Sequence, residues 1–324
     1  MKIKRIITVV GTVAVLAALA GCSSTAATAP KAGSKEKPLV IMVSKGFVAQ
    51  YWRAVDQGAQ AAGKKYGMQV VFEGPESDKA TAEQVDMLNE AITQKPAAIG
   101  FAALDSGTAG PAMAAAKAAG IPVIGFDSGV DSTVPVSTAA TNNEAAAAEA
   151  AKHLAAALPN GGKVGILNFD NTSASGIGRE KGFTDWIKAH APNITLIPTV
   201  YVHNDPQQSI DGAVAMINGN PTLKGVYATG EPEAEGLAAA IKQVNKSGLV
   251  AVGFDSGAAQ INAIKDGTLL GSITQNPVGI GYDTIETAWK LLNGKTVPKT
   301  IDTGFYWYDK SNLTDAKIAA DLYQ

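Results

Sequence analysis

Residues 122–129 (PVIGFDSG) and 251–257 (AVGFDSG) carry the same pentapeptide, Gly-Phe-Asp-Ser-Gly, 128 positions apart. Each copy ends a short apolar run, typical of a buried strand, with a carboxylate, Asp127 or Asp255. Ligands of open α/β sheets bind beyond the carboxyl ends of the strands. Either aspartate alone could instead cap the turn before the next helix. Because the pentapeptide occurs twice, we expect two related halves whose aspartates face one ligand cleft.

Strands and helices alternate around both copies of the pentapeptide. Apolar runs predict strands at 39–43, 68–72, 97–102 and 122–126, and alanine-rich amphipathic stretches predict helices at 49–66, 81–94 and 110–119. The pattern restarts with strands at 163–168, 195–202, 225–229 and 250–254 and helices at 178–190, 206–218 and 233–245. Because the apolar positions of each strand are continuous, helices should cover both sheet faces. The predicted fold class is α/β, with two Rossmann-like, doubly wound parallel-sheet domains.

The composition is that of a globular protein with room for two cores. The chain has 324 residues, of which 46% are hydrophobic and 17% charged, and domains usually hold about 100 to 200 residues. Outside residues 1–21, 24 basic residues stand against 29 acidic ones, a net charge of −5. Because nucleic-acid binding needs a concentrated basic face, we expect no nucleic-acid partner.

The N-terminus has the layout of a secretory signal. Lys2, Lys4 and Arg5 precede a largely apolar run at 6–20, which is too short to cross a hydrocarbon core of about 30 Å comfortably. An anchor helix is the alternative. Cys22, the only cysteine, follows the small residues of the sequence LAGC, and this pattern resembles a bacterial lipoprotein signal in which the thiol is diacylated.

This N-terminal pattern predicts three consequences for the chain. Residues 1–21 would be a signal peptide, and residues 22–37 would form a lipidated cysteine with a flexible tether. A second acyl chain makes membrane anchoring stable. We therefore expect an extracytoplasmic protein, lipid-anchored to the cell membrane at the outer face or in the periplasm.

Several short motifs occur along the chain in a characteristic order and spacing. They are Ser44, Tyr51 with Trp52, Gly58 with Ala59, 119–123 (AGIPV), Arg179, Gly182 with Phe183, 252–255 (VGFD) and Gln275. From residue 38 to about 305 the chain resembles the ribose- and galactose-type solute-binding proteins of bacterial ABC importers, which have the type I periplasmic-binding fold. The resemblance implies a three-segment hinge near 140–143, 274–276 and 302–304. The domains would then be 38–140 plus 276–303 and 141–275 plus 304–324.

The same resemblance implies a sugar site. A sugar ring has weakly polar faces and a rim of hydroxyls, so aromatic faces and planar polar groups suit it. Tyr51 and Trp52 match the family's stacking aromatics, although Trp52 could instead pack a helix on the sheet. Asp127 and Asp255 match its hydroxyl-binding carboxylates and Arg179 its bidentate donor. The predicted ligand-binding residues are Phe47, Gln50, Tyr51, Trp52, Asp127, Ser128, Arg179, Glu231, Asp255 and Gln275.

Three positions depart from the ribose-binding pattern. Ala102 and Gly230 stand where asparagine is usual, and Ser128 replaces an arginine. Glu231 either supplies a replacement contact or caps the helix beginning at Pro232. Because the residues usual at these three positions would bind the hydroxyls at the edge of the sugar, their replacement implies a ligand other than ribose. Lys45 and the pair Asn204 and Asp205 are further candidates.

Enzyme motifs are absent from the sequence. The three histidines lack metal-ligand spacing, and there is no phosphate loop, no Gly-x-Gly-x-x-Gly after the first strand and no Gly-x-Ser-x-Gly elbow. We therefore expect no enzymatic activity, no metal and no cofactor. A repressor core of the same fold would need a helix-turn-helix where the secretion signal lies.

The resulting functional hypothesis is ligand capture by closure of a cleft. A monomeric binding lipoprotein would enclose a monosaccharide or related polyol and deliver it to the membrane subunits of an ABC importer. The alternative is a binding lipoprotein for a nucleoside or signalling polyol that serves a membrane sensor.

Overall fold

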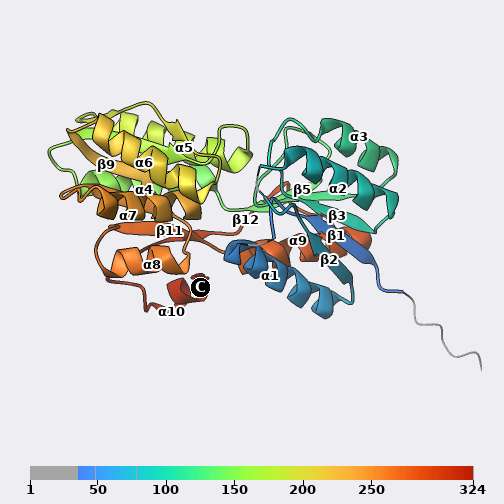
Figure 1. The fold of residues 1–324 in the computed structure, drawn as a ribbon. Coiled ribbons are helices and arrows are strands. Elements are labelled where there is room, and N and C mark those ends of the chain that lie inside the picture. The colour runs from blue at the N-terminus through green and yellow to red at the C-terminus, as the bar shows by residue number, and fades with distance from the viewer. Residues whose placement is uncertain (1–35, 48, 78, 324) are drawn as a thin grey trace, which may run out of the picture. The chain divides into compact units, whose positions relative to one another are not determined.

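Two sheets organise the computed structural model, which describes residues 36–323 except 48 and 78 (Figure 1). The first contains β1 (Leu39–Val43), β2 (Gln69–Glu73), β3 (Ala98–Phe101), β4 (Val123–Phe126), β5 (Ser137–Ala140) and β12 (Thr300–Asp302). Their order is β12-β5-β4-β3-β1-β2, and all of these pairs are parallel.

The second sheet repeats this design. It contains β6 (Gly162–Asn168), β7 (Ile194–Leu196), β8 (Val200–Tyr201), β9 (Leu223–Ala228), β10 (Val250–Phe254), β11 (Gly271–Gln275) and β13 (Phe305–Asp309). The order is β13-β11-β10-β9-β6-β7, with β8 also paired to β6. Only β13 is antiparallel among these described pairs. Two α/β domains, each built on a largely parallel sheet, are present, as predicted.

Helices cover both faces of the first sheet. In Figure 1, α1 (Gln50–Tyr66) and α9 (Pro277–Leu292) lie together on one face, and α2 (Thr81–Thr93) and α3 (Gly110–Ala118) lie on the other. Glycines bring α1 and α9 unusually close. A Cβ atom added at Gly58 would lie 1.9 Å from the carbonyl oxygen of Val278 in α9. A Cβ atom added at Gly281 would lie 1.9 Å from the carbonyl oxygen of Val55 in α1. This packing fixes the N-terminal end of α1, which carries Tyr51 and Trp52.

Helices cover the second sheet in the same way. On one face lie α4 (Asn143–Ala156) and α5 (Ala174–His190), and on the other lie α6 (Pro206–Gly219), α7 (Glu231–Gln243) and α8 (Ala258–Lys265). The short α10 (Ala316–Ala320) follows β13. The central strands, such as β1, β3, β4, β10 and β11, are buried along nearly their whole length, as the continuous apolar runs predicted, whereas the outer strands β2, β7, β12 and β13 are partly exposed.

Several expected elements have different bounds, and three of the differences have a local cause or bear on the site. The strand expected at 195–202 is interrupted between β7 and β8 around Pro198, which has no N–H to give to a ladder. The α5 helix begins at Ala174 rather than 178, because the Ser173 side chain caps it by accepting from the Gly176 amide. The α7 helix begins at Glu231 rather than 233. No strand or helix was predicted for β5, α4, α8, β11, α9, β12, β13 or α10.

The chain passes between the sheets at three places. These are the link from β5 to α4, the link from β11 to α9 and the link from β12 to β13. They fall within the three segments expected for the hinge. The predicted signal peptide, Cys22 and nearly all of the tether lie outside the described residues. None of the helices within 36–323 that the structure describes is long and apolar enough to span a membrane.

Candidate ligand-binding site

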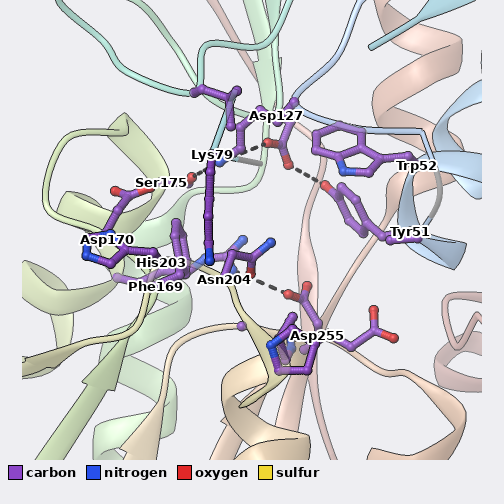
Figure 2. A pocket seen from close by; sticks show the side chains of 18 of the residues that line it. Tyr51, Trp52, Lys79, Asp127, Phe169, Asp170, Ser175, His203, Asn204 and Asp255 are labelled. Carbon is purple, nitrogen blue, oxygen red and sulfur yellow. Dashed lines mark hydrogen bonds and ion pairs between the residues drawn. The ribbon is translucent and has the colours of Figure 1, made fainter. Parts of the chain in front are cut away.

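A cavity of about 550 Å³ lies at the carboxyl ends of the strands. Its lining follows those strand ends: Lys45 after β1, Asp127 after β4, Phe169 after β6, Gly230 after β9 and Asp255 after β10. Seven of the predicted site residues line it, namely Tyr51, Trp52, Asp127, Arg179, Glu231, Asp255 and Gln275. Both sheets therefore contribute polar groups to one cavity (Figure 2).

The two Gly-Phe-Asp-Ser-Gly loops have the same local geometry. Asp127 has φ 57° and Asp255 has φ 75°, a left-handed backbone that aspartate tolerates better than most residues. The amide of Asp127 donates to Ala139 in the neighbouring strand at 2.9 Å, and that of Asp255 donates to Ile273 at 2.6 Å. Unusual backbone conformations of this kind gather at functional sites. The repeated loop therefore directs two buried carboxylates into the cavity from different sheets.

The aromatic pair of α1 is tied to the first aspartate. The Tyr51 hydroxyl donates to Asp127 Oδ1 at 2.5 Å, as Figure 2 shows. Burial, followed by the nearby charge of Asp127, raises the pKa of Tyr51 well above its ordinary value. Trp52 packs edge-to-face on Tyr51, with ring centroids 5.0 Å apart, and on Phe126 at 6.4 Å. Trp52 therefore packs against the sheet and also lines the cavity.

Arg179 is held rigidly beside the second aspartate. Its Nε donates to Asn143 Oδ1 at 2.8 Å, and its Nη1 donates to the Thr229 carbonyl at 2.8 Å and to Asp255 Oδ2 at 3.4 Å. The guanidinium lies 3.7 Å from the ring centre of Phe254. Burial opposes its charge, but Asp255 and Asp127 outweigh burial, so the pKa of Arg179 is raised.

Gln275 joins the two halves of the site at a crossover. Its Nε2 donates to Asp255 Oδ1 at 2.7 Å, and its Oε1 accepts from Thr141 Oγ1 at 2.9 Å and from the Tyr51 hydroxyl at 3.4 Å. The side chain is only 2% exposed. Because the single hydroxyl hydrogen of Tyr51 lies between Asp127 at 2.5 Å and Gln275 at 3.4 Å, the side chains that connect Asp127 to Asp255 through Tyr51 and Gln275 include one weak link.

Lys45 is a buried amine of the cavity. Its Nζ donates to Ser175 Oγ at 3.0 Å, lies 4.0 Å from Asp127 Oδ2 and sits 5.2 Å from the ring centre of Phe169. Phe169 and Asp170 were not predicted as site residues. The signal was available, because both follow the end of β6 as Asp127 follows the end of β4. Together Lys45 and Phe169 add a donor and an aromatic face to the site.

Loops from the two sheets also touch at the mouth of the cavity. Lys79 Nζ lies 2.6 Å from Asp205 Oδ2, and the Ser106 amide donates to the Thr172 carbonyl at 3.0 Å. His203 and Asn204, with φ of 53° and 54°, line the mouth next to Asp205. Figure 2 shows Lys79 reaching toward the His203 and Asn204 side of the cavity. Contacts between the two sheets therefore occur at the mouth of the cavity as well as inside it.

Three predicted residues do not line this cavity. Phe47 is 45% exposed. Ser128 is buried behind Asp127, where its hydroxyl accepts from the Ser175 amide at 3.3 Å. Gln50 faces a different cavity of about 330 Å³, because its position at the first turn of α1 lies beside α9 and the C-terminal segment. The structure therefore does not bring Phe47, Gln50 and Ser128 to the ligand cavity.

Glu231 lines the cavity from the first turn of α7. The N-cap residue of α7 is Gly230 and no side chain caps the helix, so of the two alternatives for Glu231 the capping role is not observed. Burial, with smaller contributions from Asp255 and Glu235, raises the pKa of Glu231 to about 8. Near neutral pH its carboxyl is therefore largely protonated and able to donate as well as accept a hydrogen bond.

The arrangement is suited to binding a neutral, hydroxyl-rich molecule. Carboxylates accept from hydroxyls, Arg179 and Lys45 donate to ring and hydroxyl oxygens, and Trp52 and Phe169 offer apolar surface. In the part of the chain that the structure describes, no group of three or more His, Cys, Asp or Glu is arranged to hold a metal ion.

Known proteins share this design. A family model described as a periplasmic binding protein domain matches residues 40–296. The D-ribose/D-allose-binding protein of Pseudomonas aeruginosa is 28% identical over 278 residues, which are 83% of this chain and 86% of that protein. The ribose import binding protein of Bacillus subtilis is 25% identical over 253 residues, which are 78% and 80% of the two chains.

Solved structures agree with the family match. An ABC transporter solute-binding protein from Agrobacterium vitis with bound D-fucose has a TM-score of 0.84 and 33% identity, covering 88% of this chain and 99% of that one. A carbohydrate transporter solute-binding protein from Agrobacterium radiobacter in complex with D-arabinose has a TM-score of 0.85 and 30% identity, covering 89% and 100%. The resemblance inferred from the sequence motifs is confirmed, and the chain belongs to the periplasmic binding protein family.

Proposed function

We propose that this protein is the extracytoplasmic substrate-binding lipoprotein of an ABC importer and captures a monosaccharide or related polyol by closure of its cleft. One observation carries the proposal: Asp127 and Asp255 lie on equivalent loops of different sheets and line one cavity. A ligand that bonds to both aspartates must bridge the two sheets. Its binding energy then favours the state in which the cleft is closed.

The lining supports a sugar as the ligand. Adjacent hydroxyls match paired carboxylate oxygens, and the sugar's apolar face matches the aromatic surface of Trp52 and Phe169. Relatives bind D-fucose and D-arabinose, both of which carry such hydroxyls. A protonated Glu231 adds a donor for a ring or hydroxyl oxygen at the position opened by Gly230.

Closure would occur by rotation at the three crossovers. The segments between β5 and α4, between β11 and α9 and between β12 and β13 are the only covalent links between the sheets within residues 37–323 that the structure describes. Rotation there would separate Lys79 from Asp205 and Lys45 from Ser175. Ligand binding and these contacts would act together, because both form only when the sheets approach.

The proposal includes the expected domain division and cellular location. One domain would hold residues 38–140 plus 276–303 and the other 141–275 plus 304–324. Diacylation of Cys22, after removal of residues 1–21, would tether a monomer to the cell membrane. The closed form would dock on the importer's membrane subunits and release its ligand there.

A thermal-shift screen tests the ligand class. The compounds are D-ribose, D-allose, D-fucose, D-arabinose, a set of polyols and a set of nucleosides. Stabilisation follows RT ln(1 + [L]/Kd), so a ligand present at about a thousand times its Kd adds about 4 kcal/mol. A shift with one of the sugars or polyols that is lost in Asp255→Ala supports the proposal. Stabilisation by nucleosides alone, or by none of these compounds, contradicts it.

A further inference from the structure

The last residues of the described chain return to the ligand site. After β13 and α10, residues 321–323 lie beside the loop that follows β10 and beside the end of β11. The Asp321 carbonyl accepts from Thr274 Oγ1 at 2.6 Å, and the Tyr323 amide donates to Ser256 Oγ at 3.4 Å. The Ser256 amide in turn donates to the Tyr323 hydroxyl at 3.2 Å. Tyr323 is therefore bonded to the residue directly after Asp255.

The ring of Tyr323 packs against the opposite sheet's core. It lies edge-to-face on Tyr51, with centroids 5.6 Å apart and an angle of 69° between the planes. It belongs to the apolar cluster that contains Val55 and Ile280 of α1 and α9, and it is 8% exposed. Ile318 of α10, also 8% exposed, belongs instead to the cluster of the second sheet. The C-terminal segment thus contacts both halves through different side chains.

Tyr323 also separates two cavities. Tyr51 lines the ligand cavity, and Tyr323 lines the second cavity of about 330 Å³ together with residues of α1 and α9. The two rings in contact form part of the wall between these spaces. Figure 1 shows the C-terminus next to α10 and near the start of α1.

We propose that Tyr323 is a positioning residue, and that the C-terminal segment is a strap that holds Tyr51 and the Asp255 loop in their ligand-binding geometry. The inference rests on the proposed function, since it concerns the affinity of that site. Tyr323 does not line the ligand cavity, but it contacts Tyr51, which does, so it acts on the site through its neighbours.

Two physical effects connect Tyr323 to affinity. Ser256 is fully buried, so without the Tyr323 hydroxyl its amide has lost a partner, and a buried unpaired donor is unfavourable enough to move the loop. Loss of the ring leaves a void beside Tyr51, which then has freedom to turn away from Asp127. Both changes displace groups on which a bound sugar would depend.

Three variants of the mature chain separate positioning from general stability. Tyr323→Ala removes the ring and the hydroxyl, Tyr323→Phe removes only the hydroxyl, and Ile318→Ala removes an equally buried side chain of the same segment. Calorimetry with D-fucose and with D-ribose as separate probes measures Kd, and thermal unfolding measures Tm. Tyr323→Ala should weaken binding about tenfold or more, and Tyr323→Phe, which keeps the ring but leaves the Ser256 amide unpaired, should weaken it by a smaller factor.

Ile318→Ala is the control for a general loss of stability. Ile318→Ala should lower Tm yet keep Kd within about twofold of the wild type, because its contacts lie in the second sheet's core alone. If Tyr323→Ala leaves Kd within the same range, or if Ile318→Ala weakens binding equally, the positioning role is wrong.

A ligand-free measurement distinguishes this inference from the proposed function. Hydrogen exchange of the Ser256 amide should be faster in Tyr323→Ala and Tyr323→Phe than in the wild type, but not in Ile318→Ala. If the wild type binds no sugar, the proposed function fails, and faster exchange still supports the strap. Unchanged exchange in both Tyr323 variants overturns the strap whatever the protein binds.

Discussion

The Tyr51 hydroxyl donates a hydrogen bond to Asp127 Oδ1. This bond joins helix α1 to the loop after β4, and both side chains line the cavity. Tyr51 also lies 3.4 Å from Gln275 Oε1, and Gln275 bonds to Asp255. The two repeated aspartates are therefore linked through side chains in addition to the backbone crossovers. A substitution at any one of these four side chains should therefore alter the positions of the others.

Tyr51→Phe should weaken ligand binding about tenfold while leaving the fold intact. The ring and its contact with Trp52 remain, but Asp127 loses its charge-assisted donor and its carboxylate is free to turn. Isothermal titration with the ligand from the thermal-shift screen measures the change. Tyr306→Phe, at an exposed tyrosine of β13, should have no effect on Kd. Equal affinities in wild type and Tyr51→Phe would show that this bond does not orient Asp127.

The sequence was sufficient to predict the groups that follow strand ends. An apolar run determines where a buried strand lies, and the next polar residue then falls at the sheet's carboxyl edge; Asp127 and Asp255 follow this rule. Phe169 also follows a strand, β6, but it is apolar, and an aromatic residue after an apolar strand resembles a continuation of the core.

Contacts between distant loops could not be predicted in this way. The pairing of Lys79 with Asp205 depends on how closely the two sheets approach, which no local pattern encodes. Gln50 shows that proximity in the sequence does not place a side chain in the same cavity. It is adjacent to Tyr51 in the sequence, but successive helix positions point in directions about 100° apart, and Gln50 faces the second cavity.

Glu231 should make stability depend on pH. Its pKa is about 8 in the folded state, against an ordinary value of 4.5. Between these values the folded protein retains a proton that the unfolded chain releases, so this group's contribution to stability is fully present below pH 4.5 and falls as pH rises toward 8. Melting temperatures at several pH values should decline less over this range in Glu231→Gln. Glu76→Gln, at an exposed loop position, is the control, and parallel curves for wild type and Glu231→Gln would contradict the assignment.

Lys79→Ala should accelerate ligand release. Its amine pairs with Asp205 across the mouth of the cavity, and this pairing, together with a backbone hydrogen bond from Gln208, lowers the pKa of Asp205 to about 2. Both groups are partly exposed, so the effect should be a fewfold increase in the dissociation rate and should diminish at high salt. Stopped-flow fluorescence measures the rate. Lys163→Ala, at the opposite end of β6, should dissociate like the wild type; identical rates in Lys79→Ala would mean that the pair does not retain the ligand.

Cys22→Ala should abolish membrane anchoring. The only cysteine follows the small residues at the end of the apolar segment, so no other thiol is available for acylation. The variant should remain unprocessed or appear free of the membrane on fractionation with metabolic lipid labelling. Ligand affinity should not change, since the tether lies outside both predicted domains. Recovery of processed, diacylated variant from the membrane fraction would disprove the lipoprotein assignment.

Asp127→Ala and Asp255→Ala test whether the repeated loops work as a pair. If each carboxylate accepts from a buried sugar hydroxyl, each substitution should cost about 2 to 4 kcal/mol of binding, because the hydroxyl is left buried without its partner. Both variants should also lose ligand-driven compaction in small-angle scattering, since the aspartates belong to different sheets. Trp52→Ala serves as the comparison for lost stacking.

If the aspartates only shape their left-handed turns, Tm of the empty protein should fall in each variant while Kd stays nearly constant. That second outcome would remove the sugar site from these loops and leave the fold unaffected.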